Sequence, residues 1–554
     1  MFLNTKPRRR WSALSALLVL QLILIALFFS LTRADAQGQT VGLLLNTERA
    51  FDGYTLFTPT HEGNAYLIDN AGRVVHSWEK GTGTNLTPYL LEDGSVIRMN
   101  RGITQRAWDG SLVWNFGYPE GHHDIEVLPN GNVLMVAEDF KTAEEAIAEG
   151  RDPDALNVGA LVSQKIVEVH QTGPTTGEIV WEWRAWDHLV QDFDPTKDNY
   201  AVVGDHPELI DINFGDTQFN NDDGDWLHTN SVDYNPELDQ IVMSVRQLSE
   251  LWVIDHSTTT EEAASDSGGT SGMGGGILYR WGNPQAYRAG GVEDQQLFFQ
   301  HDAQWITPGL PGEGNLLIFN NGVGRPGGSE SSIEEIVPPV DSSGSYSLNP
   351  GEAYGPAEPV WSYSDGPEFY SFIISGVGRL SNGNTLITSG VRGIIFEVTP
   401  DGETVWKYVN PIEAAGRLRQ GDPIPTGFGN DVFRAYRYAP DYPGLTGRDL
   451  TPGGALELPK PTPTATTTPT VTATPTATAT PTSTPTPVIA PGDVNGDGDV
   501  SAIDAALILQ FNAGLLDSLR YPGSADVNVD GDINSIDAAL VLQFTAGLLS
   551  TLPA

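Results

Sequence analysis

Residues 225–246 of the chain read DWLHTNSVDYNPELDQIVMSVR. A histidine, His228, comes shortly before a strand-like segment, and an Asn-Pro turn separates this segment from a second one. The same order of histidine, strand, turn and strand recurs at 121–137 and again at 300–319. A histidine at the start of three similar hairpins indicates both a repeated fold and a shared site.

A second repeat consists of strand-like segments that end on tryptophan. Six of them end at or near Trp78, Trp114, Trp181, Trp281, Trp361 and Trp406. Several follow hairpins with an Asn-Gly or Asp-Gly turn, which supplies the positive φ that tight hairpins require. Six units of about four strands predict an all-β fold, a six-bladed β-propeller at 41–415 with an extension at 416–458. A β-sandwich with accidental turn similarity is the alternative.

The composition limits the classes of partner and chemistry. The 554 residues carry a formal net charge of −41, which argues against nucleic acid and anionic membranes as partners. The chain has no cysteine, so disulfides, thiol nucleophiles and thiolate metal sites are excluded.

Both ends of the chain differ from the propeller. Residues 1–36 combine a basic start, an apolar run and Ala34-Asp35-Ala36, which predicts an export signal that is cleaved or kept as an N-terminal anchor. We therefore expect a secreted or extracytoplasmic protein, with cell-surface attachment as a further option. Residues 459–488 are almost entirely Pro, Thr, Ala and Ser and predict an extended linker.

Residues 490–550 contain an internal repeat offset by 33 positions, which we interpret as two EF-hand-type loops, each followed by a helix. Carboxylate and amide oxygens at alternating loop positions suit Ca²⁺. The expected ligands are Asp493, Asn495, Asp497, Asp499 and Asp504 in the first loop and Asp526, Asn528, Asp530, Asp532 and Asp537 in the second.

This duplicated loop-helix resembles a type I dockerin, a small α-helical calcium-binding domain. The resemblance implies reversible binding to a cohesin module, with Ala502-Ile503 and Ser535-Ile536 facing the partner. The alternative is a calcium-stabilised cap without a partner.

In a propeller, the first strand of each blade lines the central channel, so we expect His123, His228 and His301 to converge there. Imidazole can attack an electrophile or carry a proton, and cationic groups stabilise anions. The alternatives are structural hydrogen bonding within the channel and a metal site built by the histidines.

Several stretches resemble the arylsulfate sulfotransferase family. They are 225–246, YRWGNPQAY at 279–287, QHDAQW at 300–305, Asn320-Asn321-Gly322 with Arg325, and 379–385 followed by 403–411. The resemblance implies a periplasmic or secreted six-bladed propeller. It would move a sulfuryl group from an aryl sulfate to a phenol through a sulfohistidine, without a nucleotide cofactor.

The resemblance implies catalytic roles for His228, His301 and Arg325, with His123 as a further member and Arg246 and Asn230 as substrate contacts. It also implies a nucleophilic histidine in a later blade, yet 369–376 has none and no histidine follows His301. The nucleophile is then His228 or His301, or the propeller is a non-catalytic binder of an anionic or aromatic ligand such as a sulfated polysaccharide.

Overall fold

The structure of the protein is a computed structural model. The structure describes residues 39–79, 87–156, 158–215, 224–425, 427–460, 490–496, 498–512, 516, 518–529, 531–545, 549 and 551–552. The expected signal segment, nearly all of the expected linker, and Asp497 and Asp530 lie outside these residues. The chain forms two compact units, divided near residue 463.

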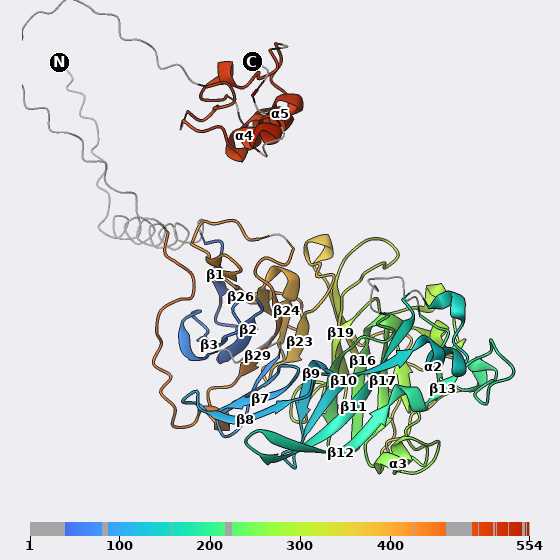
Figure 1. The fold of residues 1–554 in the computed structure, drawn as a ribbon. Helices are drawn as coiled ribbons and strands as arrows, with labels where there is room; N and C mark the ends of the chain where they lie inside the picture. The colour runs from blue at the N-terminus through green and yellow to red at the C-terminus, as the bar shows by residue number, and fades with distance from the viewer. Residues whose placement is uncertain are drawn as a thin grey trace, which may run out of the picture. The chain divides into compact units, whose positions relative to one another are not determined.

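The first unit is a six-bladed β-propeller, as the repeats predict (Figure 1). From the innermost strand outward, blade 1 consists of β29 (Val432–Tyr438), β2 (Tyr54–Pro59), β3 (Ala65–Asp69) and β4 (Val74–Trp78). Blade 2 consists of β5 (Pro88–Leu90), β6 (Val96–Met99), β7 (Gly102–Arg106) and β8 (Leu112–Gly117). Blade 3 consists of β9 (Gly121–Val127), β10 (Val133–Thr142), β11 (Ala160–Gly173) and β12 (Thr176–Arg184).

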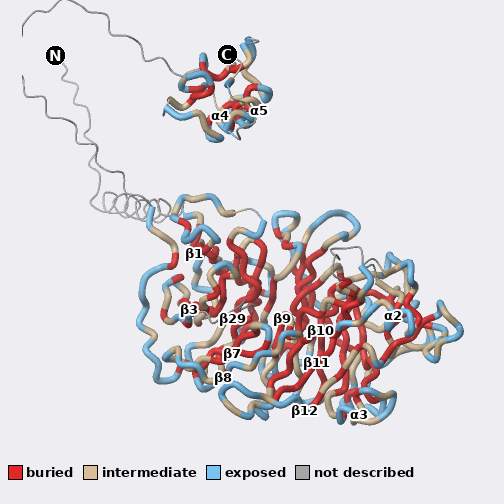
Figure 2. The backbone as a smooth tube through the Cα atoms, in the orientation of Figure 1, coloured by how far each residue is buried: buried red, intermediate tan, exposed pale blue. Residues whose placement is uncertain are grey.

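Blades 4 to 6 follow the same antiparallel order. Blade 4 consists of β15 (Thr229–Asn235), β16 (Gln240–Val245), β17 (Glu250–Asp255) and β18 (Tyr279–Trp281). Blade 5 consists of β19 (His301–Trp305), β20 (Leu316–Asn320), β21 (Ser332–Ile336) and β22 (Trp361–Tyr363). Blade 6 consists of β23 (Gly376–Arg379), β24 (Thr385–Ser389), β25 (Ile394–Val398) and β26 (Thr404–Val409), with β1 (Gly42–Asn46) added as a fifth strand. Most of these strands are buried, because each blade packs between two others (Figure 2).

Two strands close the ring from opposite ends of the propeller sequence. β29 pairs with β2 as the innermost strand of blade 1, and β1 pairs with β26 as the outermost strand of blade 6. We expected 416–458 to be an extension, but the structure places 432–438 inside the propeller. Each of blades 1 and 6 therefore contains strands from both ends of the propeller sequence.

Each of the six repeated tryptophans lies on the fourth strand of a blade and donates its indole N–H to the following blade. The acceptors are Ala107 O for Trp78, Thr176 O for Trp114, Thr258 Oγ1 for Trp181, Pro356 O for Trp281, Pro400 O for Trp361 and Asn70 O for Trp406. The last of these bonds crosses from blade 6 to blade 1. A hydrogen bond of this kind is worth about 1 kcal/mol, so the indoles help to fix the position of each blade against the next.

Insertions between blade strands carry the small elements. They are the helices α2 (Ala143–Ala148) and α3 (Thr260–Ala263) and the short strands β13 (Leu189–Val190), β14 (Ile210–Asp211), β27 (Ile412–Glu413) and β28 (Gly416–Arg417). Single 3₁₀ turns lie at Pro153–Ala155, Ala185–Asp187, Val203–Asp205, Arg246–Leu248, Pro284–Tyr287, Val292–Asp294, Gly366–Glu368, Gly390–Arg392 and Pro443–Leu445. Thr142 and Glu145 form a capping box on α2, which explains why the helix begins at Ala143.

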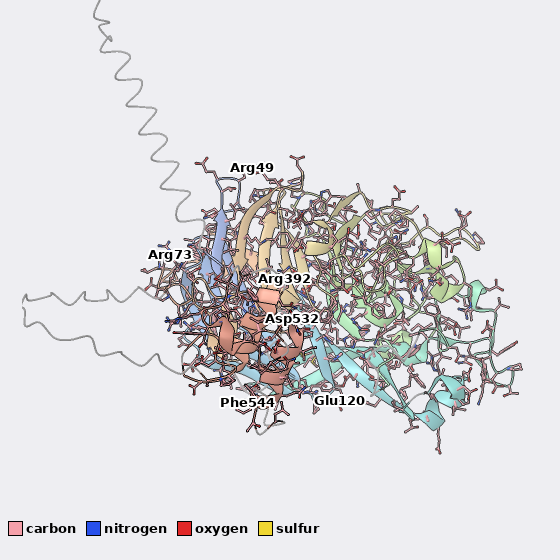
Figure 3. All side chains as sticks on the ribbon, turned by 90° about the horizontal axis from the view of Figure 1, so that it is seen from above. Arg49, Arg73, Glu120, Arg392, Asp532 and Phe544 are labelled. Atoms are coloured by element: carbon pink, nitrogen blue, oxygen red, sulfur yellow. The ribbon has the colours of Figure 1, made fainter. Side chains whose placement is uncertain are left out.

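Two charged side chains on the outside of the propeller can be followed from above. Arg49 and Arg73 point away from the blades (Figure 3), and about half of each side chain is exposed.

The second unit contains two equal helices, α4 (Ala502–Asn512) and α5 (Ser535–Thr545), and a 3₁₀ turn at Pro522–Ser524. Its core includes Ala505 and Ile508 of α4 and the matching Ala538 and Val541 of α5. Because the two repeats contribute equivalent residues, they pack on each other as a pseudo-symmetric pair.

None of the helices in the described part of the chain has both the length and the apolar character needed to cross a membrane.

Candidate active site

The innermost strands of blades 3, 4 and 5 begin at the end of the channel that carries the histidines. Equivalent contacts between neighbouring strands fix their relative register: Asp124, Ser231 and Asp302 accept the backbone N–H of Val232, Ala303 and Val377. The residues directly before these three acceptors are His123, Asn230 and His301, so these three residues occupy equivalent positions in the three blades. His228 therefore lies two residues earlier than the sequence alignment predicts.

Three histidines gather at this end, two of which we expected. The ring centroids of His123 and His228 lie 4.6 Å apart, and that of His122 lies 3.8 Å from His123 and 5.3 Å from His228. His123 and His228 adopt left-handed backbone conformations, with φ of +55° and +49°. Such strain is uncommon outside glycine and is found at functional sites.

His228 is held by a carboxylate on one side and has an unused nitrogen on the other. Its Nδ1 lies against Oδ2 of Asp225, so Nδ1 carries the proton and donates it. Its Nε2 is buried without a hydrogen-bond partner among the described residues. About 19% of the side chain is exposed, although Nε2 itself is buried. This is the arrangement of an oriented imidazole with a free lone pair.

His301 is fully buried, and both of its ring nitrogens are engaged. Nδ1 donates to Oδ1 of Asn321 at 2.7 Å, and Nε2 accepts the backbone N–H of Ile374 at 3.1 Å. Burial lowers the pKa of His301 well below its usual value, and Arg246 adds to this. Of the two candidate nucleophiles, only His228 has a nitrogen free for attack in this structure.

Arg246 is the buried cation of the site. Its backbone N–H donates to the carbonyl oxygen of His228 at 3.4 Å, and its guanidinium lies 4.9 Å from the ring of Phe299. Burial lowers its pKa to about 10, which leaves it charged at neutral pH. Among the described residues it makes no ion pair, and its Nε has no hydrogen-bond partner. Asp225 interacts with it only at longer range and raises its pKa slightly against the effect of burial. A buried guanidinium without an ion pair suits an anionic ligand.

The two other expected site residues have structural contacts. Asn230 is buried and donates from Nδ2 to the carbonyl oxygen of Gln300 at 2.8 Å, which ties blade 4 to blade 5. Arg325 donates to Oγ of Ser332 at 2.6 Å and lies over Phe298. The interactions described for Arg325 do not join it to the histidines.

Arg434, on β29, is a buried cation that the sequence reasoning missed. Its Nη1 lies 2.9 Å from Oδ2 of Asp124 and 3.1 Å from Oδ1 of Asp302. Burial raises the pKa of Asp302 to about 6, although Arg434 opposes this shift. The two aspartates directly follow His123 and His301 in the sequence. This repeated His-Asp pair was the one local pattern that could have indicated two buried carboxylates in need of a cation. Arg434 lies about 310 positions from Asp124, too far for any local pattern to show.

The converging histidines do not form a metal site. Among the described residues, no three or more His, Cys, Asp or Glu side chains are arranged to hold a metal ion. His301 could not contribute, because both of its ring nitrogens are already bonded.

The expected calcium loops are built around buried carboxylates. Asp504 accepts the backbone N–H groups of Val494 and Asn495, and Asp537 accepts those of Val527 and Asn528. Asp493 accepts the N–H groups of Gly496 and Gly498, and Asp526 accepts that of Gly531. The remaining described candidates, Asn495, Asp499, Asn528 and Asp532, lie in the same two loops.

Asp493, Asp504 and Asp537 are at most 2% exposed, yet no ion pair with a basic side chain is found for them among the described residues. A buried carboxylate requires a compensating positive charge, so the loops suit a bound dication. Asp497 and Asp530 lie outside the described residues, so each loop shows only part of its expected ligand set.

Comparison with known proteins defines the class. Residues 45–411 match the model of the arylsulfotransferase (ASST) family, and residues 491–544 match that of the dockerin type I domain. Because the first match covers most of the chain, this protein belongs to the arylsulfotransferase family and carries a C-terminal type I dockerin domain.

A curated relative is the arylsulfate sulfotransferase AssT of Escherichia coli O6:H1, 25% identical over 308 residues, which are 51% of this chain and 47% of the relative. The chain thus spans about half the length of that relative. A Bacteroides caccae protein of unknown function is similar over 70% of this chain and 98% of its own, at 11% identity and a TM-score of 0.38. A dockerin from Acetivibrio cellulolyticus, solved in complex with a cohesin, is 36% identical over 12% of this chain and 94% of its own, with a TM-score of 0.12.

Proposed function

We propose that the propeller transfers a sulfuryl group from an aryl sulfate to a phenol, with His228 as the nucleophile and no nucleotide sulfate donor. The observation that carries the proposal is the free Nε2 of His228, whose Nδ1 is fixed by Asp225. Membership of the arylsulfotransferase family supports the reaction class.

The chemistry follows from these contacts. The Nε2 lone pair attacks sulfur while the bond from sulfur to the aryl oxygen breaks and leaves its electron pair on that oxygen. Asp225 accepts a hydrogen bond from Nδ1–H, which keeps its proton, and so stabilises the positive charge that develops on the ring. Arg246 faces the negative oxygens of the group in transfer. His123, whose ring lies 4.6 Å from that of His228, exchanges the proton of the phenol.

A direct experiment uses the full chain with 4-nitrophenyl sulfate and a phenol acceptor. We expect nitrophenol release that depends on the acceptor, a mass increase of one sulfuryl group on the peptide that contains His228, and loss of both in His228→Ala. Transfer at an unchanged rate in His228→Ala would exclude this histidine as the nucleophile.

A non-catalytic propeller that binds an anionic or aromatic ligand is the second candidate. Two observations favour it. Ile374 lies in the segment where the family resemblance implies a histidine, and its backbone N–H donates to Nε2 of His301, so that this nitrogen is not free to react. Calorimetry with aryl sulfates and sulfated polysaccharides would then show binding without turnover.

We further propose that the dockerin domain attaches the enzyme to a cohesin outside the cytoplasm and that Ca²⁺ is bound in its loops. Ile503 and Ile536 are the second residues of α4 and α5 and are 61% and 56% exposed. An apolar residue that two repeats both expose suits a docking surface. Binding to an immobilised cohesin should require Ca²⁺ and should fall in Ile503→Asp and Ile536→Asp together.

A further inference from the structure

His122 and His123 are neighbours in sequence, and their side chains are bonded to each other. The two Nδ1 atoms lie 2.9 Å apart. A hydrogen bond at this distance holds one proton, so one imidazole donates and the other accepts. The two rings therefore have opposite tautomers in any state where both are neutral.

Two arrangements satisfy this bond. In the first, His123 donates from Nδ1 and has a lone pair at Nε2, while His122 carries its second proton at Nε2. In the second, His122 donates from Nδ1, and His123 carries a proton at Nε2. Nε2 of His123 makes no hydrogen bond among the described residues, so it is able to accept or donate a proton.

The far end of the pair reaches a carboxylate. Nε2 of His122 lies 3.8 Å from Oε1 of Glu138, a residue of β10. Each of these two side chains is 21% exposed, so a proton arriving there is in contact with solvent.

The other histidines are bonded differently. His76 and His188 bond to backbone carbonyl oxygens, and His206 and His256 bond to carboxylates, which can only accept a proton. Partners of that kind fix one tautomer. Among the described residues, His122 and His123 are the pair in which either partner can donate, and they lie beside the proposed nucleophile.

We infer that His122 and His123 form a proton wire between the aryl oxygen of the substrate and Glu138. This inference rests on the proposed function. As the bond between sulfur and the aryl oxygen breaks, Nε2–H of His123 passes its proton to that oxygen. The bridging proton moves from His122 to His123, and Nε2 of His122 takes up a proton from the solvent beside Glu138, whose carboxylate attracts it. When the acceptor phenol reacts, each proton moves in the reverse direction, so the cycle neither gains nor loses a proton.

Two donors of different leaving ability test the wire. Phenol has a pKa of about 10, as the tyrosine side chain does, and leaves sulfur much faster when it is protonated. Nitrophenolate is a stable anion that needs little help. The release is measured in the first turnover without an acceptor, so that only cleavage of the donor contributes. Under these conditions His122→Leu should slow the release of phenol from phenyl sulfate by about 10- to 100-fold, the range of a modest acid–base contribution, and leave release from 4-nitrophenyl sulfate almost unchanged.

His122→Asn is the second variant, because its amide oxygen can still accept the Nδ1 proton of His123 but cannot relay it. It should show the same selective loss, and it decides the question if His122→Leu fails to fold. His170→Leu is the matched control, since His170 is an exposed imidazole of the same blade that bonds to Asn132.

Equal slowing with both donors would show that His122 only supports the structure, and no slowing with either would show that it has no role. Both results overturn the wire while the transferase proposal stands. If the wild-type protein releases neither phenol nor nitrophenol, the proposed function fails, and the wire fails with it.

Discussion

The carboxylate of Asp225 selects the tautomer of His228. It accepts a hydrogen bond from Nδ1–H, so the proton stays on Nδ1 and the lone pair remains at Nε2. In Asp225→Asn, the amide can donate to Nδ1 and thereby move the ring proton to Nε2. We expect transfer to fall by about 100-fold or more without a change in fold, by analogy with tautomer loss in serine protease triads.

The measurement is the rate of nitrophenol release, with thermal unfolding as the check on folding. Asp194→Asn, an exposed aspartate of a surface loop, is the control. An active Asp225→Asn variant would mean that Asp225 does not orient the nucleophile.

Arg434 compensates two buried aspartates, and its loss should affect stability. In Arg434→Met, Asp124 and Asp302 would stay buried without a counter-charge. Removal of one partner from a buried ion pair costs about 3–5 kcal/mol. Arg73→Met, which breaks an exposed pair with Asp69, should cost about 1 kcal/mol or less. Urea titration of both variants compares the two costs, and similar values would contradict the assigned role of Arg434.

The sequence was informative at this scale where residues repeat. His123 and His228 were found because each precedes a hairpin, and the structure brings their rings together. His122 was missed because the hairpin pattern uses only one histidine. Arg434 was missed because both of its aspartate partners are more than 130 positions away, and Arg325 matches the family pattern yet bonds to Ser332 instead.

At the scale of the structural elements, His256 connects blades 3 and 4, a contact we call the clasp. Its Nε2 lies 3.0 Å from Glu168 on β11, and its Nδ1 lies 2.8 Å from Asp239 in the turn between β15 and β16. Burial alone would lower the pKa of His256, but the two carboxylates outweigh it and raise the pKa above the usual 6.5.

A raised pKa stabilises the folded state fully below pH 6.5, the value for the unfolded chain, and this contribution is lost as the pH rises through the folded value. We expect the free energy of unfolding to fall as the pH rises above 6.5 and this part of the fall to vanish in His256→Gln. Thermal unfolding across that range measures it, with the exposed His170→Gln as the control. The same pH dependence in all three proteins would exclude the clasp.

The blades could be counted from sequence because each has a tryptophan on its fourth strand. β29 could not be assigned, because Val432–Tyr438 has neither the tryptophan ending nor a hairpin turn, and its partner β2 lies more than 370 positions away. Only pairing with β2 makes this segment a blade strand.

For the whole molecule, the two compact units should respond separately to calcium. The carboxylates of Asp493, Asp504 and Asp537 are buried, and a chelator would leave them without a counter-charge. We expect EDTA to abolish the unfolding transition of residues 490–552 and to leave that of the propeller in place. Calorimetry with and without Ca²⁺ records both transitions, and a dockerin transition that persists in EDTA would contradict calcium binding by these loops.

The indole bonds between blades also give the protein a built-in optical readout. Each of the six seams of the propeller contains a repeated tryptophan whose N–H is bonded to the next blade, and the seam between blades 6 and 1 is reported by Trp406. The seam between blades 3 and 4 contains a second one, Trp183, which donates to the carbonyl oxygen of Gly275. Water entering a seam would shift the fluorescence emission of its indoles to longer wavelength. In each of six single Trp→Phe variants, the fluorescence change that comes from the repeated tryptophan of one seam would be absent. Comparing the six unfolding curves would therefore identify which seam of the propeller opens first.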